Sequence, residues 1–507
     1  MTNPLYDSLF AIHAGNTGHF INNPLSGDTL SYDGFLQQTG QCANALRSMG
    51  IEKGDRVIAQ VGKSVSALVL YAGCIQAGVV YLPLNTAYTQ NEVEYFVADS
   101  GAKLMVCDQG SENSYATIAE SFATKMLTQS ADGLTGSLID LMNASSPEFE
   151  TTDCSLDDLA ALLYTSGTTG RSKGAMITQQ NLLSNAKTLK EHWQFTENDV
   201  LLHALPVFHT HGLFVATNVC LLSGAQIIFE PKFKIDRIIE LMPYATTLMG
   251  VPTFYTRLLD EPQFSKVLTK NMRLFISGSA PLLADTHKQF TQRTGHNILE
   301  RYGMTETNMN TSNPYDGERR PGTVGFALPG IEVKITDAES GDAVPNGEIG
   351  QLEVRGPNVF KGYWKMPEKT AEEIREDGFF ITGDLAQIDA DGYIHIVGRD
   401  KDLIISGGLN IYPKEIELIL DQMPGIVESA VVGIPHPDFG ESVVAVLVGE
   451  KNEIDLVAVE AGIAESLASF KRPRKFIVVE SLPRNAMGKV QKNELRSEFA
   501  TLLSEAK

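Results

Sequence analysis

The chain of 507 residues exceeds the size at which a single hydrophobic core stops growing, so we expect at least two domains. Its 43% hydrophobic and 20% charged residues are typical of a globular protein and exclude a disordered or fibrous one. The 41 Lys and Arg residues against 62 Asp and Glu residues give a net charge of −21, which argues against a general nucleic-acid binder.

Cysteine spacing and apolar stretches narrow the class of protein further. The five cysteines are widely spaced without a Cys-x-x-Cys pair, which favours a reducing cytoplasm over a disulfide framework or a structural zinc site. Two long stretches without formal charge, residues 64–91 and 201–229, are each interrupted by Pro and Gln residues. We therefore interpret them as buried helix–strand pairs rather than as membrane spans.

From Leu30 onward the sequence alternates between helical and strand periodicity. We predict a helix over residues 32–49, a strand over 56–61, a helix through Tyr71 and a strand over 79–82. The later strands, each followed by turn residues and a helical pattern, are predicted at residues 103–107, 226–229, 247–250 and 273–276. This rhythm indicates an α/β fold with layered, largely parallel sheets.

After about Gly325, short strands separated by Gly-containing turn pairs indicate a small β-rich subdomain that ends near Gly398. Beyond it, the pattern predicts a compact α+β unit, with a helix from Pro413 and strands that include residues 429–433, 443–448 and 475–479. We therefore predict a large N-terminal domain of several subdomains over residues 1–398, a hinge over 399–401 at Lys401, and a small C-terminal domain over 402–507.

A glycine- and hydroxyl-rich loop, residues 165–174, follows an apolar strand. Its glycines allow backbone N–H groups to point inward, its Ser and Thr hydroxyls can donate hydrogen bonds, and Lys173 supplies charge, so the loop can bind phosphate. It is not a Walker A loop, because Gly170 is followed by Arg171 instead of Lys. A flexible surface loop is the alternative interpretation.

This loop resembles the phosphate loop of the adenylate-forming superfamily, which includes acyl-CoA synthetases, luciferases and peptide-synthetase adenylation domains. The resemblance continues in chain order through ALPVFH (204–209), GSAPL (278–282), YGMTE (302–306), TGD (382–384), GRDKD (398–402) and PRNAMGK (483–489). Within the superfamily, residues 275–287 and 300–316 are similar to malonyl-CoA synthetases. The resemblance implies that the C-terminal domain is mobile.

The resemblance also implies an ATP site in which Glu306 binds Mg²⁺, Thr305 contacts the α-phosphate, and Asp384 and Arg399 contact the ribose. The implied ATP-binding residues are Thr165, Ser166, Gly167, Thr168, Thr169, Gly170, Lys173, Gly278, Ala280, Pro281, Glu300, Arg301, Tyr302, Gly303, Thr305, Asp384, Arg399 and Lys489. Taken alone, each motif has an ordinary alternative: a helix N-terminus at Thr305 and Glu306, a turn aspartate at Asp384, and a solvated charge at Arg399.

By the same resemblance, Lys489 is the adenylation lysine, which would bridge the acid and the α-phosphate, with Lys492 as a rival nearby. The implied catalytic set is Lys489, Thr305, Glu306 and His209, and the implied CoA channel is Ser406, Gly407, Gly408 and Leu409. The resemblance makes His209 a wall of the acyl pocket and His211 its buried neighbour. A metal site at His203, His209 and His211 is disfavoured, because no further ligand is suitably spaced.

Arg257 and Arg301 stand in apolar segments, where an arginine requires an anionic partner. We expect Arg257, helped by Arg301, Ser279 and His209, to receive the second carboxylate of malonate; a structural salt bridge is the alternative for each arginine.

The resemblance implies ATP- and Mg²⁺-dependent ligation of malonate to coenzyme A through an acyl-adenylate, with methylmalonate as a further candidate. The alternatives are another small acid, delivery to a carrier protein, and a nucleotide-binding regulator without catalysis. We expect small-molecule partners, no nucleic acid, no membrane, and a regulatory acetyltransferase acting at Lys489.

Overall fold

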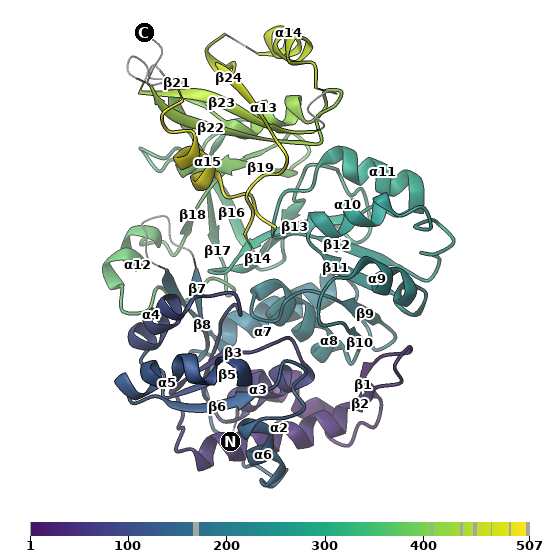
Figure 1. Cartoon of the computed structure of the whole chain (residues 1–507), viewed down its shortest axis with the longest axis vertical. Helices are drawn as coiled ribbons and strands as arrows, with labels where there is room; N and C mark the ends of the chain where they lie inside the picture. Colours follow the sequence, from purple (N-terminus) through teal and green to yellow (C-terminus); the bar gives the residue numbers. More distant parts are fainter. Residues whose placement is uncertain are drawn as a thin grey trace.

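The computed structural model describes residues 2–165, 172–406, 409–436, 440–449, 454–467, 469–485 and 488–502. Figure 1 shows a large body formed by the N-terminal four fifths of the chain and a small green-to-yellow C-terminal part at one end. The four sheets have six, nine, four and five strands. The predicted α/β fold, with layered sheets, a small β-rich subdomain and a terminal α+β unit, is confirmed.

The six-stranded sheet has the order β6-β5-β3-β4-β7-β8, parallel except for the hairpin of its last two strands. Its strands are β3 (Arg56–Gln60), β4 (Val80–Pro83), β5 (Leu104–Asp108), β6 (Lys125–Gln129), β7 (Leu159–Thr165) and β8 (Lys173–Thr178). The helices of this part of the chain are α1 (Pro4–Leu9), α2 (Tyr32–Ser48), α3 (Val65–Gln76), α4 (Gln90–Ser100), α5 (Glu112–Ser121) and α6 (Ser137–Asn143), with 3₁₀ turns η1 (Ala11–His13) and η2 (Gln109–Ser111).

The nine-stranded sheet has the order β15-β14-β13-β12-β11-β9-β10-β1-β2, with a parallel centre and antiparallel edges. Its strands are β1 (His19–Asn22), β2 (Thr29–Ser31), β9 (Val200–His203), β10 (Gln226–Phe229), β11 (Thr247–Gly250), β12 (Leu274–Ser277), β13 (Leu299–Met304), β14 (Asn308–Ser312) and β15 (Phe326–Ala327). The intervening helices are α7 (Gln179–His192), the π-helix η3 (His211–Thr217), α8 (Asn218–Ser223), α9 (Ile235–Leu241), η4 (Met242–Tyr244), α10 (Pro252–Asp260) and α11 (Ala284–Thr294).

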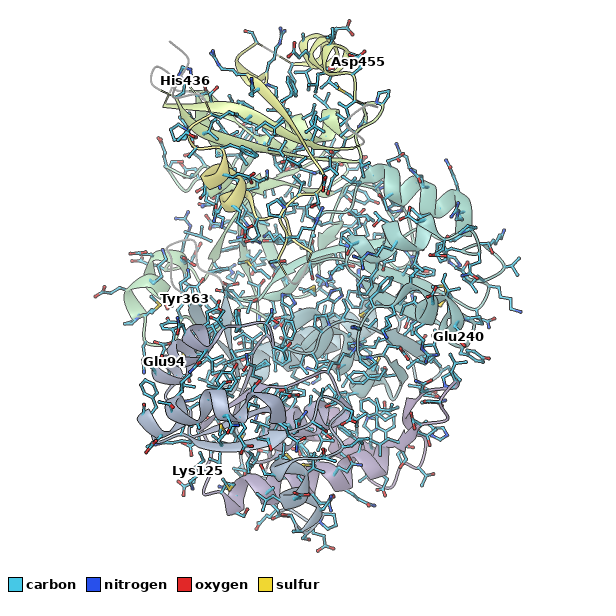
Figure 2. All side chains as sticks on the ribbon, in the orientation of Figure 1. Glu94, Lys125, Glu240, Tyr363, His436 and Asp455 are labelled. Carbon is cyan, nitrogen blue, oxygen red and sulfur yellow. The ribbon has the colours of Figure 1, made fainter. Side chains whose placement is uncertain are left out.

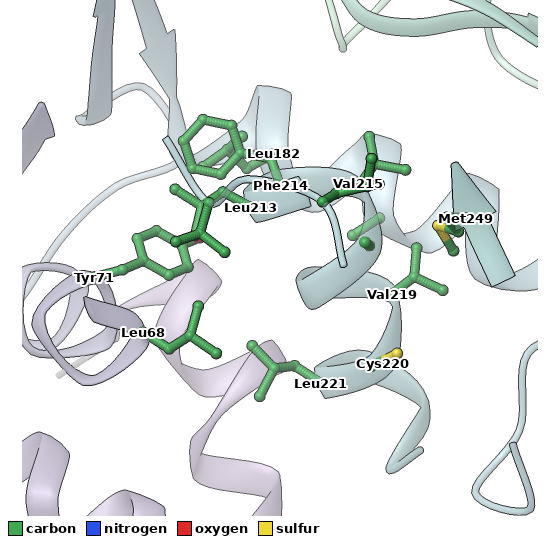
Figure 3. Packing of buried hydrophobic residues seen from close by; sticks show 14 of the residues in the cluster. Leu68, Tyr71, Leu182, Leu213, Phe214, Val215, Val219, Cys220, Leu221 and Met249 are labelled. Carbon is green, nitrogen blue, oxygen red and sulfur yellow. The ribbon is translucent and has the colours of Figure 1, made fainter. Parts of the chain in front are cut away.

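One continuous apolar core joins these two sheets. In Figure 3, Leu68 and Tyr71 of α3 face Leu213, Phe214 and Leu221 of the η3–α8 segment, and the rings of Tyr71 and Phe214 lie 5.7 Å apart. Both charge-free stretches are thus core helix–strand segments, as predicted. Among the described residues, no helix has the length and apolar character needed to cross a membrane.

The β-rich subdomain is a four-stranded antiparallel sheet that lies between the body and the C-terminal part (Figure 1). Its elements are β16 (Glu332–Thr336), β17 (Gly350–Arg355), α12 (Pro367–Glu373), β18 (Phe380–Ile388) and β19 (Ile394–Arg399). After the 3₁₀ turn η5 (Asp400–Asp402), the C-terminal part builds two apolar clusters of its own. Its elements are β20 (Ile404–Ser406), β21 (Leu409–Ile411), α13 (Pro413–Leu420), β22 (Glu428–His436), β23 (Gly440–Val448), α14 (Leu456–Ser466), η6 (Ser469–Lys471), β24 (Lys475–Val479) and α15 (Lys492–Glu498).

Candidate active site

A cavity of about 310 Å³ lies where the C-terminal part meets the carboxyl ends of β9 and β11. Its walls combine Leu205, Pro206, Val251, Thr253, Phe254 and Arg257 of the body with Arg484, Asn485 and Gly488 of the C-terminal part. The carboxyl ends of parallel strands are where open α/β sheets bind their ligands. The segments after β9, β11 and β12, together with the end of β13, carry most of the acid-site residues predicted from the sequence.

Arg301, on β13, is a buried charged group beside Gly278. It is only 4% exposed, and within the described part of the chain its Nε and Nη2 atoms have no hydrogen-bond partner. Burial lowers the pKa of the Arg301 guanidinium to about 9, so it remains charged at neutral pH. A buried cation with unused donors is costly unless an anion joins it, so this guanidinium is chemically suited to an anionic partner.

The backbone beside Arg301 is shaped to accommodate it. A Cβ atom added to Gly278 would lie 2.3–2.6 Å from three guanidinium-group atoms of Arg301, so a side chain at position 278 would force the guanidinium to shift. The next residue, Ser279, has a φ of 71°, in the left-handed region that non-glycine residues rarely adopt. Backbone strain of this kind concentrates at functional sites. The Ser279 hydroxyl lies 3.2 Å from His211 Nδ1.

The two histidines near Arg301 are uncharged. Burial, reinforced by the positive charge of Arg301, lowers the pKa of His209 to about 4 and that of His211 well below its usual value. Neutral imidazoles at neutral pH can shape the pocket and form hydrogen bonds without adding a further positive charge. No cluster of three or more His, Cys, Asp or Glu side chains suited to a metal ion is found among the residues that the structure describes.

We expected Arg257 to lie in apolar surroundings, and this prediction was wrong. Arg257 lies on α10, whose buried face is formed by Phe254, Tyr255 and Leu258, whereas Arg257 itself is exposed and lines the cavity at its rim. A helix buries one face, and the apolar residues around Arg257 in the sequence occupy that face. The desolvated arginine is therefore Arg301, and Arg257 is placed to meet an anion at the mouth of the cavity.

Asp384 and Arg399 form an ion pair at the junction of the β-rich subdomain and the C-terminal part. They are cross-strand neighbours on β18 and β19, and Arg399 Nε lies 2.6 Å from Asp384 Oδ1. The Tyr302 hydroxyl donates a hydrogen bond to Asp384 Oδ2 at 2.5 Å. Burial is the largest single influence on Arg399 and lowers its pKa, but Asp384 and the other acidic groups around it together raise the pKa above its usual value. The alternatives of a turn aspartate and a solvated arginine are wrong.

Lys489 extends toward this ion pair from a tight turn. Its N–H donates to Asn485 Oδ1 at 3.0 Å, and Gly488 turns the chain with a φ of 75°. Although Lys489 keeps access to solvent, the surrounding protein and the charge of Arg399 lower its ammonium pKa to about 8. The rival Lys492 lies 2.5 Å from Glu417 Oε1, in an ion pair within the C-terminal part. Of the two lysines, Lys489 is the one on which the charges of Arg399 and Asp384 act.

The phosphate side of the site is described only in part. Ser166, Gly167, Thr168, Thr169 and Gly170 lie outside the described residues, as do Gly407 and Gly408 of the predicted CoA channel. At the two ends of the phosphate loop, Thr165 closes β7 and Lys173 opens β8, where the two residues pair across the hairpin.

Glu306 lies in the turn between β13 and β14, so the alternative of a helix N-terminus for Thr305 and Glu306 is wrong. Glu306 is 6% exposed, and burial raises the pKa of its carboxyl group. A carboxylate oxygen is a suitable ligand for a hard divalent cation. The buried Lys173 is paired with Glu373 at 3.0 Å, a contact that the sequence did not indicate.

The remaining predicted residues lie around these groups. Ala280 and Pro281 follow β12, and Gly303 lies on β13, where an added Cβ would collide with the carbonyl of Asn308. The Glu300 Oε1 atom lies 3.4 Å from His287 Nδ1. This contact favours a structural role for the Glu300 side chain over a role in ATP binding. On the C-terminal part, Ser406 closes β20 and Leu409 opens β21.

The layered sheets, the buried arginine and the lysine turn of a second domain together define a two-domain adenylate-forming enzyme. The chain belongs to the AMP-binding enzyme family, whose model matches residues 13–364. The model of the AMP-binding enzyme C-terminal domain matches residues 415–489.

Relatives that are named for different acids have the same sequence identity to the chain. A malonate–CoA ligase of Arabidopsis thaliana is 36% identical over 490 residues, covering 90% of this chain and 80% of the relative. A feruloyl-CoA synthase of an Amycolatopsis species is also 36% identical, over 482 residues, covering 93% and 94%.

Among solved structures, ATP-bound MatB from Rhodopseudomonas palustris is 56% identical with a TM-score of 0.97, covering 99% of this chain and 100% of MatB. The apo structure of the same protein, with the same identity and coverage, has a TM-score of 0.86. The overall arrangement of this chain is therefore more similar to the ATP-bound form.

Gly278→Ala should displace the Arg301 guanidinium, because the new methyl group would overlap it. A misplacement on the order of 1 Å at a binding group lowers kcat/KM by about 100-fold, so we expect a loss of that size in acid-dependent ATP–pyrophosphate exchange. Gly110→Ala, at an exposed 3₁₀ turn, is the matched control and should leave exchange unchanged. Wild-type exchange in Gly278→Ala would show that Arg301 is not held by this contact.

Proposed function

We propose that the protein ligates malonate to coenzyme A in two half-reactions. The malonate carboxylate attacks the α-phosphorus of ATP, forming malonyl-AMP and releasing pyrophosphate; the thiol of CoA then displaces AMP and forms the thioester. The observation that carries the proposal is the buried Arg301 guanidinium with unused donors. Because the malonate- and ferulate-named relatives are equally similar, the choice of acid rests on this group.

A dicarboxylic acid fits the charges at the cleft. One carboxylate of malonate would react, while the second would accept hydrogen bonds from Arg301 and Ser279, with Arg257 at the rim drawing the dianion in. His209 and His211, held neutral, would line the pocket. An acid without the second carboxylate would leave Arg301 buried and unpaired, which is the basis for rejecting it.

The nucleotide would lie across the junction between the two domains. Asp384, fixed by Arg399 and Tyr302, would accept hydrogen bonds from the ribose hydroxyls, and residues 278–281 would line the adenine. Thr305 would contact the α-phosphate, and the loop from Thr165 to Lys173 would surround the β- and γ-phosphates. Glu306 offers one buried carboxylate, which fits Mg²⁺ because this ion takes few protein ligands beside phosphate and water. Bound Mg²⁺ would offset phosphate charge.

Lys489 and the CoA channel would serve different half-reactions. In this arrangement the Lys489 turn touches the body, since a Cβ on Gly488 would lie 3.6 Å from the Thr253 hydroxyl. We place domain boundaries at residues 398 and 402 with Lys401 as the hinge, because η5 joins two parts with separate cores. Rotation there would withdraw Lys489 and bring in the segment from Ser406 to Leu409.

The proposal also includes a cytoplasmic location and regulation by an acetyltransferase. The five cysteines are buried free thiols, which suits a reducing cytoplasm. Lys489 is accessible and has a lowered pKa, so an acetyltransferase could modify it and remove the charge that adenylation uses.

The direct test is incubation with ATP, Mg²⁺, CoA and one acid at a time, with AMP and acyl-CoA measured. We expect malonyl-CoA from malonate and little product from ferulate or acetate. Acyl-AMP without thioester would favour delivery to a carrier protein, and no AMP from any acid would favour a regulator.

Arg301→Met should lower malonate kcat/KM by two to three decades or more, because removing one partner of a desolvated ion pair costs roughly 3–5 kcal/mol. Activity on short monocarboxylates should hold or rise. Arg257→Met should reduce malonate kcat/KM less than about tenfold, because an exposed charge contributes little. Steady-state kinetics with malonate and acetate measure both variants. Equal losses in the two, or unchanged selectivity in Arg301→Met, would contradict the assignment of Arg301.

Lys489→Ala should abolish adenylation and retain thioester formation from supplied malonyl-AMP and CoA. The protonated lysine is the active form. Because its pKa in the free enzyme is lowered to about 8, kcat/KM for adenylation should be full below that pH and fall as the pH rises through it. Pyrophosphate release over a pH series measures this, and equal loss of both half-reactions in folded Lys489→Ala would refute the separate role.

Lys401→Pro should keep adenylation and lose thioester formation. Proline fixes φ near −65°, which the 3₁₀ turn η5 accommodates in the present arrangement but a rotated backbone would not. Lys401→Ala is the control and should keep both half-reactions. If Lys401→Pro forms thioester at the wild-type rate from supplied malonyl-AMP, the hinge lies elsewhere.

A further inference from the structure

Residues 360–364 connect the metal side of the cleft with the base of the phosphate loop. The Phe360 N–H donates to the Glu306 carbonyl at 2.8 Å. Further along, the Met176 N–H donates to Gly362 at 2.9 Å and the Trp364 N–H donates to Gly174 at 2.7 Å, so the segment pairs along β8. These backbone bonds hold the segment in place, together with the hydrogen bond that the Tyr363 N–H donates to Thr370 Oγ1 at 2.9 Å.

Within this segment, the hydroxyl of Tyr363 lies between two carboxylates. Tyr363 is 2% exposed, and its hydroxyl lies 2.7 Å from Glu373 Oε2 and 3.2 Å from Glu306 Oε1. In Figure 2, Tyr363 lies beside α12, the helix that ends with Glu373. A phenol has one proton to donate, so both carboxylates share it.

Tyr363 and Glu373 also contact Lys173, the lysine at the end of the phosphate loop. The other oxygen of Glu373 lies 3.0 Å from Lys173 Nζ, which stands 4.1 Å from the centre of the Tyr363 ring. The Glu373 charge is thus offset by Lys173 and by Lys369, which lies 3.2 Å away on α12. The Tyr363 hydroxyl thus fixes the position of one oxygen of the Glu306 carboxyl group.

We propose that Tyr363 and Glu373 are positioning residues for Mg²⁺-dependent ATP binding. They aim the Glu306 carboxylate and hold Lys173 at the start of β8, and neither is assigned to contact the nucleotide. The inference rests on the proposed function only in taking Glu306 as the metal ligand. Partners that orient a metal ligand typically account for 10- to 100-fold in metal affinity.

The test is calorimetric titration of ATP into the protein over a series of Mg²⁺ concentrations, without acid or CoA. For Tyr363→Phe, which keeps the ring under Lys173, the half-saturating Mg²⁺ concentration should rise by about 10- to 100-fold. ATP affinity should recover at saturating Mg²⁺. Glu373→Gln should also raise the half-saturating Mg²⁺ concentration. The double variant should show less than the sum of the two effects, because the two residues belong to one hydrogen-bonded network.

Glu372→Gln is the matched control, since Glu372 lies on the same helix, is exposed, and pairs with Lys369 at 2.8 Å. It should bind ATP as the wild type does. The proposal is overturned if Tyr363→Phe and Glu373→Gln keep the wild-type Mg²⁺ dependence, or if their ATP affinity falls by the same factor at every Mg²⁺ concentration. It is also overturned if Glu372→Gln raises the half-saturating Mg²⁺ concentration equally. Since no acid is present, a wrong assignment of malonate leaves this result unaffected.

Discussion

A buried guanidinium with two donors unpaired among the described residues is the constraint on which the acid side of the cleft depends. Arg301 remains charged at 4% exposure, and its neighbours fit that charge: Gly278 has no side chain, and His209 and His211 are neutral. Desolvating a cation costs several kcal/mol, so the large apolar core of the body has to offset this local penalty. The binding of a carboxylate would satisfy the same group that the fold leaves unpaired.

The second half of the site depends on contact between two domains with separate cores. The Asp384–Arg399 pair ends the β-rich subdomain, and Lys489 approaches it from the C-terminal part. Because that part has its own apolar clusters, it can move as a unit without opening the core of the body. Under the proposed function, one cleft would then present a lysine for adenylation and a different segment for thioester formation.

Short apolar runs between turn residues were predicted well. The strands at residues 226–229, 247–250 and 475–479 begin and end where the sequence indicated, because alternation and flanking turn residues are local signals. The ordered motifs also identified the family. Asp384 and Arg399 form an ion pair, and the charges of both act on Lys489.

The errors and omissions concern relations that sequence order does not encode. The exposed position of Arg257 depends on which face of α10 packs inward, and the turn at Glu306 depends on β14 returning along β13. Tyr363 and Glu373 were missed because they meet Lys173 only after residues 361–364 pair along β8, with Glu373 and Lys173 separated by 200 positions in the chain. Composition near such residues carries no signal of a partner so distant.

The central claim is that the charge on Arg301 selects the acid, and the most direct measurement compares malonate with malonamate, its neutral half-amide of nearly equal size, in ATP–pyrophosphate exchange. Shape is nearly the same in the two compounds, so the difference reports the second carboxylate alone. The account predicts that malonamate kcat/KM is lower by two decades or more, about the effect of leaving a buried charge unpaired. Equal exchange with malonate and malonamate would contradict it.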